Sequence, residues 1–338
     1  MLLSVLMPSN RDLAASRRSI ETALRFCEKQ DALLVVSDNS GDPDKRRLLE
    51  SASPRLRYIT PEREGIEANL LNLYAAAETE FVLMMGDDDE LFVSPKDKPI
   101  DLATVDPAHI GVRPLVAVAN SEGRVIRVKD FGIPDDTPSA RVMTYNANAK
   151  GDNAAYYSIF RRKPYVDLHR FFFAHHPLKG GYCDWALATV LFAAGKMVYD
   201  PGTIFKYNHH RWDKRDKIDE RMQAMYADAG LPPNADQFSL LLLYLDLMIL
   251  ALRGGSPLDE AAKDDLARNA GWPILANFCR KVTGEPEAFT PQTMTLCRRL
   301  AAQAGVEAQV AIALELADQL LPGLAMRYRA FQQISLTV

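Results

Sequence analysis

The stretch Phe81-Val82-Leu83-Met84-Met85-Gly86-Asp87-Asp88-Asp89 decides the fold of this chain. Its apolar run, Phe81 to Met85, has the length and composition of a strand buried on both faces, as in a parallel sheet. Gly86 ends the run, and three carboxylates follow at once. Adjacent carboxylates repel one another unless a cation compensates them. The stretch therefore indicates either a divalent-cation site with oxygen ligands or a solvated acidic turn at a strand end.

Strands and helices alternate upstream of this stretch. We expect strands over residues 2–7, 32–36 and 56–59, and helices over residues 13–29, 44–51 and 66–77. This alternation specifies an α/β fold with a doubly wound, mostly parallel sheet. Ligands bind such sheets outside the carboxyl ends of the strands. The turns after Met7, Val36 and Met85 should therefore converge on one crevice.

That convergence favours a nucleotide and metal site over a solvated turn, because it places Asp38 beside the Asp87–Asp89 cluster. No GxGxxG motif follows the first expected strand, and no GxxxxGK[ST] motif occurs in the sequence. The fingerprints of dinucleotide binding and of P-loop chemistry are therefore missing.

Three segments, Leu3–Asn10, Leu34–Ser40 and Phe81–Asp89, together resemble the glycosyltransferase family 2 pattern of the GT-A fold. The resemblance is close over residues 1–92 and looser up to residue 212. It implies that Asp38 hydrogen-bonds the base of a nucleotide-diphosphate sugar, with the turn after Pro8 packed beside it. It also implies that the acidic cluster holds Mn²⁺ or Mg²⁺ on the diphosphate. The expected nucleotide-binding residues are Pro8, Ser9, Asn10, Arg11, Asp38, Asp87 and Asp88, and the expected metal ligands are Asp88, Asp89 and His209.

One position departs from the family pattern. The family usually has an acidic residue two positions before its paired aspartates, and Gly86 stands there in this chain. Asp87 is therefore expected either to contact the ribose or only to support Asp88 and Asp89.

A second informative stretch surrounds Asp184, which follows Gly180-Gly181 and lies in the first turn of an expected helix. An aspartate there can simply cap the helix or complement its dipole. The resembling family places its general base in a comparable position, and in an inverting transfer that base deprotonates the acceptor hydroxyl. Asp184 is our candidate base. Asp200, at a Pro-Gly turn, is the second choice.

Residues 198–202 and 203–212 are expected to form a strand pair that runs into a polar patch. Neighbouring histidines on a strand point to opposite sides, so His209 and His210 should not both serve one site. His209 is the candidate that would complete the metal shell. Lys206, His210 and Arg211 are candidates for contact with the acceptor or the diphosphate. The alternative is a surface cluster without function.

The remaining sequence carries weaker signals. We expect strands over residues 110–112, 115–118, 124–128 and 153–160, and a loop at His175-His176 near the acceptor. Helices are expected over residues 238–252, 292–303 and 306–321. This gives a catalytic domain over residues 1–215 and a helical domain over residues 216–338, the latter for acceptor binding, homo-oligomer formation or membrane-surface docking.

Composition limits the class of protein. The chain has 338 residues and a formal net charge of −4, which argues against a nucleic-acid binder that relies on a basic surface. Its four cysteines include no CxxC pair, as expected in a reducing cytoplasm. No signal peptide is expected, since Pro8 interrupts the apolar start. The apolar stretch 238–252 is shorter than the roughly 20 residues that span a bilayer, so a buried helix is expected.

These observations predict a metal-dependent, inverting glycosyltransferase of the hexosyltransferase type, acting in bacterial surface glycan synthesis. The acceptor would be a glycan, a lipid-linked molecule or a protein, and the enzyme would be cytoplasmic or peripheral at the inner face of the membrane. A sugar-phosphate nucleotidyltransferase is the enzymatic alternative, although Pro8-Ser9-Asn10-Arg11 lacks the glycines of its loop. A non-catalytic sugar-nucleotide binding protein is the alternative from another class.

Overall fold

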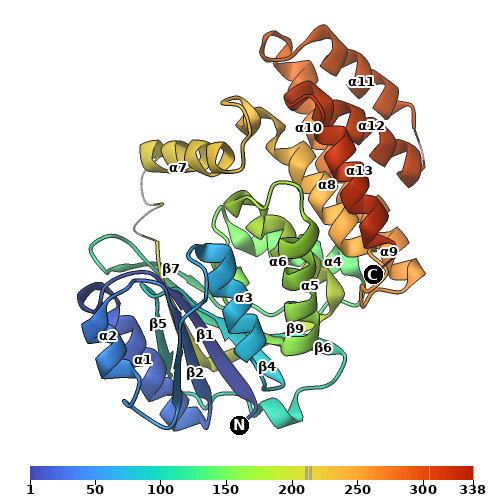
Figure 1. The fold of residues 1–338 in the computed structure, drawn as a ribbon. Helices are drawn as coiled ribbons and strands as arrows, with labels where there is room; N and C mark the ends of the chain where they lie inside the picture. Colours follow the sequence, from blue (N-terminus) through green and yellow to red (C-terminus); the bar gives the residue numbers. More distant parts are fainter. Residues whose placement is uncertain (210–211, 213–214, 304, 338) are drawn as a thin grey trace. The chain divides into compact units, whose positions relative to one another are not determined.

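The computed structural model describes residues 1–209, 212, 215–303 and 305–337, and its chain divides into two compact units (Figure 1). The first unit comprises Met1–Pro134, Ala147–Arg170 and Gly195–Lys214, and the second comprises Asp135–Asn146, Phe171–Ala194 and Arg215–Val338. The last change of unit lies next to the boundary expected at residue 215. Residues 135–146 and 171–194, which were expected in the catalytic domain, group instead with the C-terminal helices.

The first unit is built on one nine-stranded sheet with the strand order β3-β2-β1-β4-β8-β6-β9-β5, in which β7 also pairs with β6. The strands are β1 (Leu3–Ser9), β2 (Leu33–Asp38), β3 (Leu56–Ile59), β4 (Phe81–Met84), β5 (Glu90–Val93), β6 (His109–Ala119), β7 (Val125–Lys129), β8 (Ile159–Arg161) and β9 (Lys196–Asn208). Its helices are α1 (Leu13–Gln30), α2 (Pro43–Leu49) and α3 (Ile66–Ala76), with a short 3₁₀ turn η1 (Leu102–Thr104).

The first four strands of this order, β3-β2-β1-β4, are parallel, as the alternation of elements predicts. In this register Met7 lies opposite Val36 on β2, and Leu6 lies opposite Met84 on β4. All three strands therefore end at the same edge of the sheet. The predicted α/β fold is confirmed, and so is the shared edge for the three polar turns.

The core of this unit explains why β1, β2 and β4 read as continuous apolar runs. One face of β1 contributes Val5 and Met7 to a buried cluster, which Ile20 and Phe26 of α1 cover. Burial of such side chains stabilises the sheet by about 1.5–3 kcal/mol each. Asp12 begins α1 as its N-cap, because its carboxylate accepts a hydrogen bond from the Ala15 N–H at 2.8 Å.

Several local predictions were wrong. Pro8 does not end the first strand but lies within β1, opposite Ser37. The strand expected over residues 153–160 is instead a 3₁₀ turn, η2 (Ala154–Tyr156), and only β8 follows it. The two strands expected over 110–112 and 115–118 are one strand, β6. The pair expected over 198–202 and 203–212 is likewise one strand, β9, because the β6–β9 register shifts where a turn was expected and the chain bulges rather than reverses.

The second unit is helical in all the residues that the structure assigns to regular elements. Two of its helices begin or end in segments of the first unit: α4 (Pro138–Ala149) and α5 (Arg162–His175). The others are α6 (Asp184–Ala194), α7 (Arg215–Asp228), α8 (Ser239–Leu252), α9 (Glu260–Leu266), α10 (Trp272–Gly284), α11 (Pro291–Ala301), α12 (Val306–Leu320) and α13 (Leu324–Ser335), with short 3₁₀ or π turns at η3 (Gly181–Cys183), η4 (Ala235–Phe238), η5 (Ala267–Gly271) and η6 (Pro286–Ala288).

Helix α8 is the central element of this unit, and α6, α10, α12 and α13 all pack on it. Ala235–Leu252 is long and apolar enough to cross a membrane by length and composition, and 67% of it is buried. The core helix of a globular protein meets the same criterion. Burial among the other helices agrees with the buried helix expected at residues 238–252.

A buried carboxylate lies in the middle of α8. Asp246 is 1% exposed, and its Oδ1 accepts hydrogen bonds from His176 Nε2 and from the Tyr328 hydroxyl, each at 2.8 Å. Nδ1 of His176 in turn accepts the backbone N–H groups of Leu178, at 3.2 Å, and Lys179, at 2.8 Å. Asp246 therefore ties α13 and the segment after α5 to the centre of the unit. The expected loop begins at His176, after α5 ends at His175, but the His176 side chain is buried, and a place near the acceptor stays a prediction.

Asp246→Ala should destabilise the protein, because it leaves two buried donors, His176 Nε2–H and the Tyr328 hydroxyl, without an acceptor. An unsatisfied buried donor costs about 1–3 kcal/mol. Urea unfolding should show a loss of that size for each donor, whereas Asp236→Ala, at an exposed position before α8, should change stability by less than about 0.5 kcal/mol. An Asp246→Ala protein as stable as wild type would show that the buried bonds contribute nothing net.

Candidate functional site

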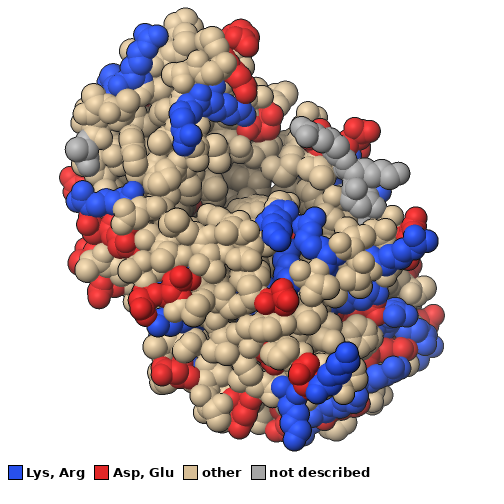
Figure 2. Space-filling view, turned by 180° about the vertical axis from the view of Figure 1, so that it is seen from behind, with Lys and Arg blue, Asp and Glu red and all other residues tan. Residues whose placement is uncertain are grey.

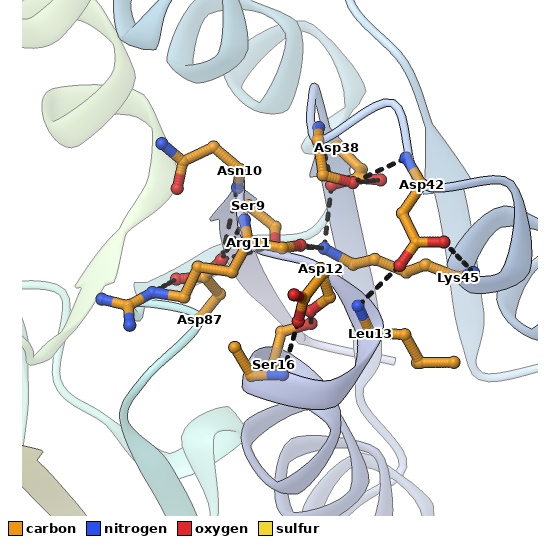
Figure 3. Close-up of polar contacts among 12 residues, drawn as sticks. Ser9, Asn10, Arg11, Asp12, Leu13, Ser16, Asp38, Asp42, Lys45 and Asp87 are labelled. Atoms are coloured by element: carbon orange, nitrogen blue, oxygen red, sulfur yellow. Dashed lines mark hydrogen bonds and ion pairs between the residues drawn. The ribbon is translucent and has the colours of Figure 1, made fainter.

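Polar residues from three turns meet at the carboxyl edge of β1, β2 and β4 (Figure 3). They come from the end of β1 and the turn that follows it, residues 9–12, from the end of β2 and its turn, residues 38–42, and from the acidic turn, residues 86–89. The sequence predicted this convergence from strand order alone, and the hydrogen bonds below confirm it.

Asp87 anchors the turn after β1. Its Oδ2 accepts the Ser9 hydroxyl at 2.6 Å and the backbone N–H groups of Asn10 and Arg11, each at 3.2 Å. Its Oδ1 accepts Arg11 Nε at 2.9 Å. A carboxylate that accepts four donors is held firmly in one orientation. These bonds tie Asp87 to the turn at residues 9–11. Contact with the ribose and support of Asp88 and Asp89, the two roles left open by the sequence, both stay predictions.

Lys45, in the first turn of α2, is the buried cation of the site and is 0% exposed. Its Nζ donates to Ser9 Oγ at 2.5 Å, to the backbone oxygen of Arg11 at 2.8 Å and to Asp38 Oδ1 at 2.8 Å. Figure 3 shows its side chain extending between Asp38 and the turn at Ser9. Three acceptors match the three donors of an ammonium group, so Lys45 links two turns with no hydrogen left unpaired.

Asp38 is 2% exposed, and protein donors reach both of its oxygens. Besides Lys45, its Oδ2 accepts the Tyr58 hydroxyl at 2.7 Å and Ser40 Oγ at 2.9 Å. Burial, together with this bond to Asp38, raises the pKa of the Tyr58 phenol. A nucleoside base would therefore meet Asp38 as part of a network with Tyr58, and contact between the base and Asp38 stays a prediction.

Asp88 and Asp89 converge on the space that a side chain at position 86 would fill. A Cβ on Gly86 would lie 2.8 Å from Asp88 Oδ1, closer than Cβ atoms come to other atoms, and 3.0 Å from Asp89 Oδ2, which is a tight contact. Asp89 is 2% exposed and accepts the N–H groups of Gly86, at 3.1 Å, and Asn208, at 2.9 Å. Glycine at position 86 thus allows two carboxylates to approach one point.

The pKa of Asp89 lies well above its usual range because the carboxyl is buried and because the charge of Asp88 is close. Both causes oppose the charged form, and a cation on the two carboxylates would offset both. Two oxygen ligands on a glycine turn are the donor set that Mg²⁺ or Mn²⁺ takes at sites shared with a phosphate. The residues present therefore fit a divalent cation.

Strand β9 brings further candidate residues to the acidic turn. Lys206 Nζ donates to Glu90 Oε1 at 2.6 Å, and Arg18 Nε donates to Glu90 Oε2 at 2.6 Å. Lys206 therefore neutralises Glu90, and contact with a diphosphate would require it to leave that partner. His209 continues β9 beyond Asn208, and its N–H donates to the Ala119 oxygen at 2.7 Å. His210 and Arg211 lie outside the described residues.

The two candidate bases lie in different units. Asp184 begins α6 in the second unit directly after η3, as expected, and is half-buried. Asp200 belongs to the first unit and is 1% exposed. It accepts the N–H groups of Gly202, at 2.8 Å, and Ile100, at 3.3 Å, and lines a pocket with Leu3, at the opposite end of β1 from Ser9. Asp200 is therefore explained by its bonds at the bulge of β9, and a base role for Asp184 stays a prediction.

Among the residues that the structure describes, one group of metal-binding side chain types belongs to the second unit. His176, Cys183 and Asp246 have ligand atoms within 4.8 Å of one another, and all three are buried. The donor set does not fit a cation, because Nδ1 of His176 already accepts two N–H groups. A neutral imidazole then carries its proton on Nε2, which faces Asp246 as a donor and has no lone pair to offer.

Sequence reasoning missed Lys45, Tyr58 and Asn208. A lysine in the first turn of a short helix is usually exposed, and nothing in the sequence distinguishes Lys45 from Arg46 and Arg47 beside it. Tyr58 and Asn208 lie on strands whose pairing brings them to Asp38 and Asp89 across 20 and 119 residues of chain. Of the three, only Asn208 lies in a stretch that the sequence analysis had marked as polar, residues 203–212.

Residues 4–165 match the family model described as glycosyl transferase family 2. No curated protein sequence gives a significant match to the chain.

Similar solved structures include crystal structures of residues 1–349 of Staphylococcus aureus TarS. One has 15% sequence identity and a TM-score of 0.46, and the match covers 98% of this chain and 90% of that chain. The complex with UDP has 17% identity and a TM-score of 0.48 over the same shares of the two chains. The complex with UDP-GlcNAc has 17% identity and a TM-score of 0.47, over 99% of this chain and 89% of that chain.

Lys45→Met should destabilise the protein strongly, since it keeps the length of the side chain but leaves the buried Asp38 without its cation. Removing one partner of a buried ion pair costs about 3–5 kcal/mol. Arg47→Met is the matched control on the same helix, because Arg47 is exposed and pairs with exposed Asp44 at 3.1 Å. Its effect should be below about 1 kcal/mol.

The double variant Asp38→Asn/Lys45→Met tests the cause of that loss. It removes the uncompensated charge, so urea unfolding should recover part of the stability lost in Lys45→Met alone. Equal stability of Lys45→Met and Arg47→Met would contradict the assignment of Lys45 as the buried cation that the two turns share.

Proposed function

We propose that this chain is a glycosyltransferase that moves a sugar from a nucleotide-diphosphate sugar to an acceptor hydroxyl, and the match of residues 4–165 to the glycosyl transferase family 2 model supports the proposal. The observation that carries the proposal is the convergence of the turn at Ser9–Arg11 with Asp87 and Asp88, at the carboxyl edge of three parallel strands. The carboxyl edge is where doubly wound sheets bind nucleotides.

In this proposal the diphosphate lies between the turn after β1 and the acidic turn. In the turn after β1, the N–H groups of Asn10 and Arg11 already donate to Asp87. The side chain of Arg11 is therefore the group of this turn that we expect to bind a phosphate. A guanidinium is suited to the task, because its fork of donors matches two phosphate oxygens at once. Asp38 and Tyr58 lie on the side of the nucleoside, where their network would meet the base.

Asp88 and Asp89 would hold the divalent cation, Mn²⁺ or Mg²⁺. Such a cation supplies Lewis-acid stabilisation of the charge that develops on the leaving diphosphate. Asn208 keeps Asp89 in position through its N–H, and its side-chain amide donates to the backbone oxygen of Asp88 at 3.3 Å. Strand β9 thus holds the acidic turn in position through Asn208.

Asp184 is the proposed general base, in an inverting transfer. Its carboxylate would take the proton from the acceptor hydroxyl as that oxygen attacks the anomeric carbon and the bond to the diphosphate breaks. The acceptor would be a glycan, a lipid-linked molecule or a protein, in the synthesis of bacterial surface glycans. Acidic and basic side chains are intermingled on the face shown in Figure 2, which supports a substrate other than nucleic acid.

The geometry of the site also bears on the two alternative functions, a sugar-phosphate nucleotidyltransferase and a non-catalytic binding protein. A sugar-phosphate nucleotidyltransferase would cradle phosphates with a flexible glycine-rich loop, whereas the turn at residues 9–11 is held by Asp87 and Lys45. A non-catalytic binding protein would retain nucleotide binding but have no use for a base at Asp184. We propose a cytoplasmic location on the basis of the four free cysteines.

Nucleotide binding should depend on a divalent cation. Calorimetric titration of UDP, GDP and CDP should give at least one nucleotide that binds about tenfold or more tightly in Mn²⁺ than in EDTA, a difference of roughly 1.4 kcal/mol. Asp88→Asn should abolish the difference, and Asp97→Asn, at an exposed position of the same unit, should not. The same affinity in Mn²⁺ and in EDTA for the best nucleotide would remove the metal from the proposal.

Asp184→Asn should lower kcat by about 10²–10⁴-fold, the usual contribution of a general base, because an amide cannot accept the proton. Donor affinity and melting temperature should hardly change. Asp216→Asn is the matched control, since Asp216 is an exposed acidic residue in the first turn of α7. A purely structural Asp184 would instead show transfer largely retained in Asp184→Asn, and Asp184→Ala would lose about 1 kcal/mol of stability.

A further inference from the structure

The guanidinium of Arg11 lies against the acidic turn and pairs with two of its carboxylates. Its Nε lies 2.9 Å from Asp87 Oδ1, and its Nη2 lies 2.6 Å from Asp88 Oδ2. One guanidinium therefore bridges two neighbouring carboxylates. Its side chain is only 24% exposed, against 8% for Asp87 and 22% for Asp88, so water screens these pairs less than it screens surface pairs.

The backbone of Arg11 is held on both sides. Its N–H donates to Asp87 at 3.2 Å, and its carbonyl accepts from Lys45 at 2.8 Å. Only the side chain can move, and it cannot move far from the acidic turn. The guanidinium is thus present at a high effective concentration, and an incoming cation has to compete with it for Asp88.

The two contacts of the guanidinium are not equivalent. Asp87 also accepts hydrogen bonds from three other donors of the turn after β1. Loss of the guanidinium would therefore leave Asp87 with hydrogen-bond donors. Asp88 is the most exposed of the three aspartates, and it is a predicted metal ligand. A diphosphate beside Arg11 would offer paired anionic oxygens to the guanidinium and would release Asp88.

We propose that Arg11 is a resident counter-ion of Asp88 that moves to the donor diphosphate, so that nucleotide and divalent cation bind cooperatively. This inference rests on the proposed function. In the free enzyme Arg11 holds the affinity of Asp88 for the cation down. When a nucleoside diphosphate binds, Arg11 turns to it, and Asp88 becomes available to the cation. Linkage then requires that the cation raise the affinity for the nucleotide by the same factor.

Arg11→Gln tests the competition without enzymatic turnover. Glutamine keeps the backbone contacts with Asp87 and Lys45 and removes the charge. Mn²⁺ binding, measured by the loss of the free-ion electron paramagnetic resonance signal, should become about tenfold tighter in Arg11→Gln than in wild type without nucleotide. At a saturating concentration of UDP, GDP or CDP, whichever binds best, the two proteins should differ by less than about threefold. Arg11→Lys should lie between them, because an ammonium cannot bridge both carboxylates.

Arg18→Gln is the matched control. It removes the same kind of charge from Glu90, the first residue of β5 and the neighbour of Asp89, where Arg18 Nε lies 2.6 Å from Oε2 and the arginine side chain is 75% exposed. We expect it to leave Mn²⁺ affinity within about twofold. An increase as large as that of Arg11→Gln would mean that overall charge, and not competition for Asp88, sets the affinity, and the proposal would be wrong.

The remaining outcomes separate this proposal from the proposed function. Equal or weaker Mn²⁺ binding by a folded Arg11→Gln protein, with wild type still binding Mn²⁺, overturns the competition and leaves the metal site standing. Folding is checked by the melting temperature. No Mn²⁺ binding to wild type or to Arg11→Gln, with or without nucleotide, overturns both the competition and the metal assignment.

Discussion

The candidate site depends on one buried cation, the ammonium group of Lys45. A charge with no exposure to water is tolerated only where its hydrogens all find acceptors, and these come from Ser9, Arg11 and Asp38. Because the acceptors belong to different turns, the position of each turn is tied to the other. The main effect of the Lys45–Asp38 ion pair is therefore on geometry. Any other arrangement of the two turns would leave a buried charge without its partner, which costs free energy.

The same environment gives four consecutive acidic residues four different roles. Asp87 accepts donors from the turn after β1 and serves as its anchor. Asp89 is buried on backbone N–H groups, and Glu90 is neutralised by Lys206 and Arg18. Asp88 alone combines exposure of its side chain with a partner on a movable side chain. Residues that look equivalent in sequence are therefore differentiated by burial and by the donors that the fold brings to each.

This differentiation marks how far the sequence could predict the site. Apolar runs and turn residues predict the parallel strands β1, β2 and β4, and strand order then predicts where their turns meet. They do not predict Lys45, because its neighbours Arg46 and Arg47 have the same chemistry and only packing of α2 decides which cation is buried. Nor do they predict β9 as one strand, since Pro201-Gly202 signals a turn and tertiary pairing with β6 converts it into a bulge.

The pairing of charges at the carboxyl edge indicates why a divalent cation would be bound favourably there. Asp38 has Lys45, Asp87 has Arg11, and Glu90 has Lys206, whereas the described partners of Asp89 are backbone N–H groups. Arg11 also serves Asp88, so one protein charge covers two carboxylates. A cation with two charges would satisfy Asp88 and Asp89 together and return Arg11 to Asp87 and to the substrate. A divalent cation at this edge would therefore act on Asp88, which shares Arg11 with Asp87, and on Asp89, whose described partners are uncharged.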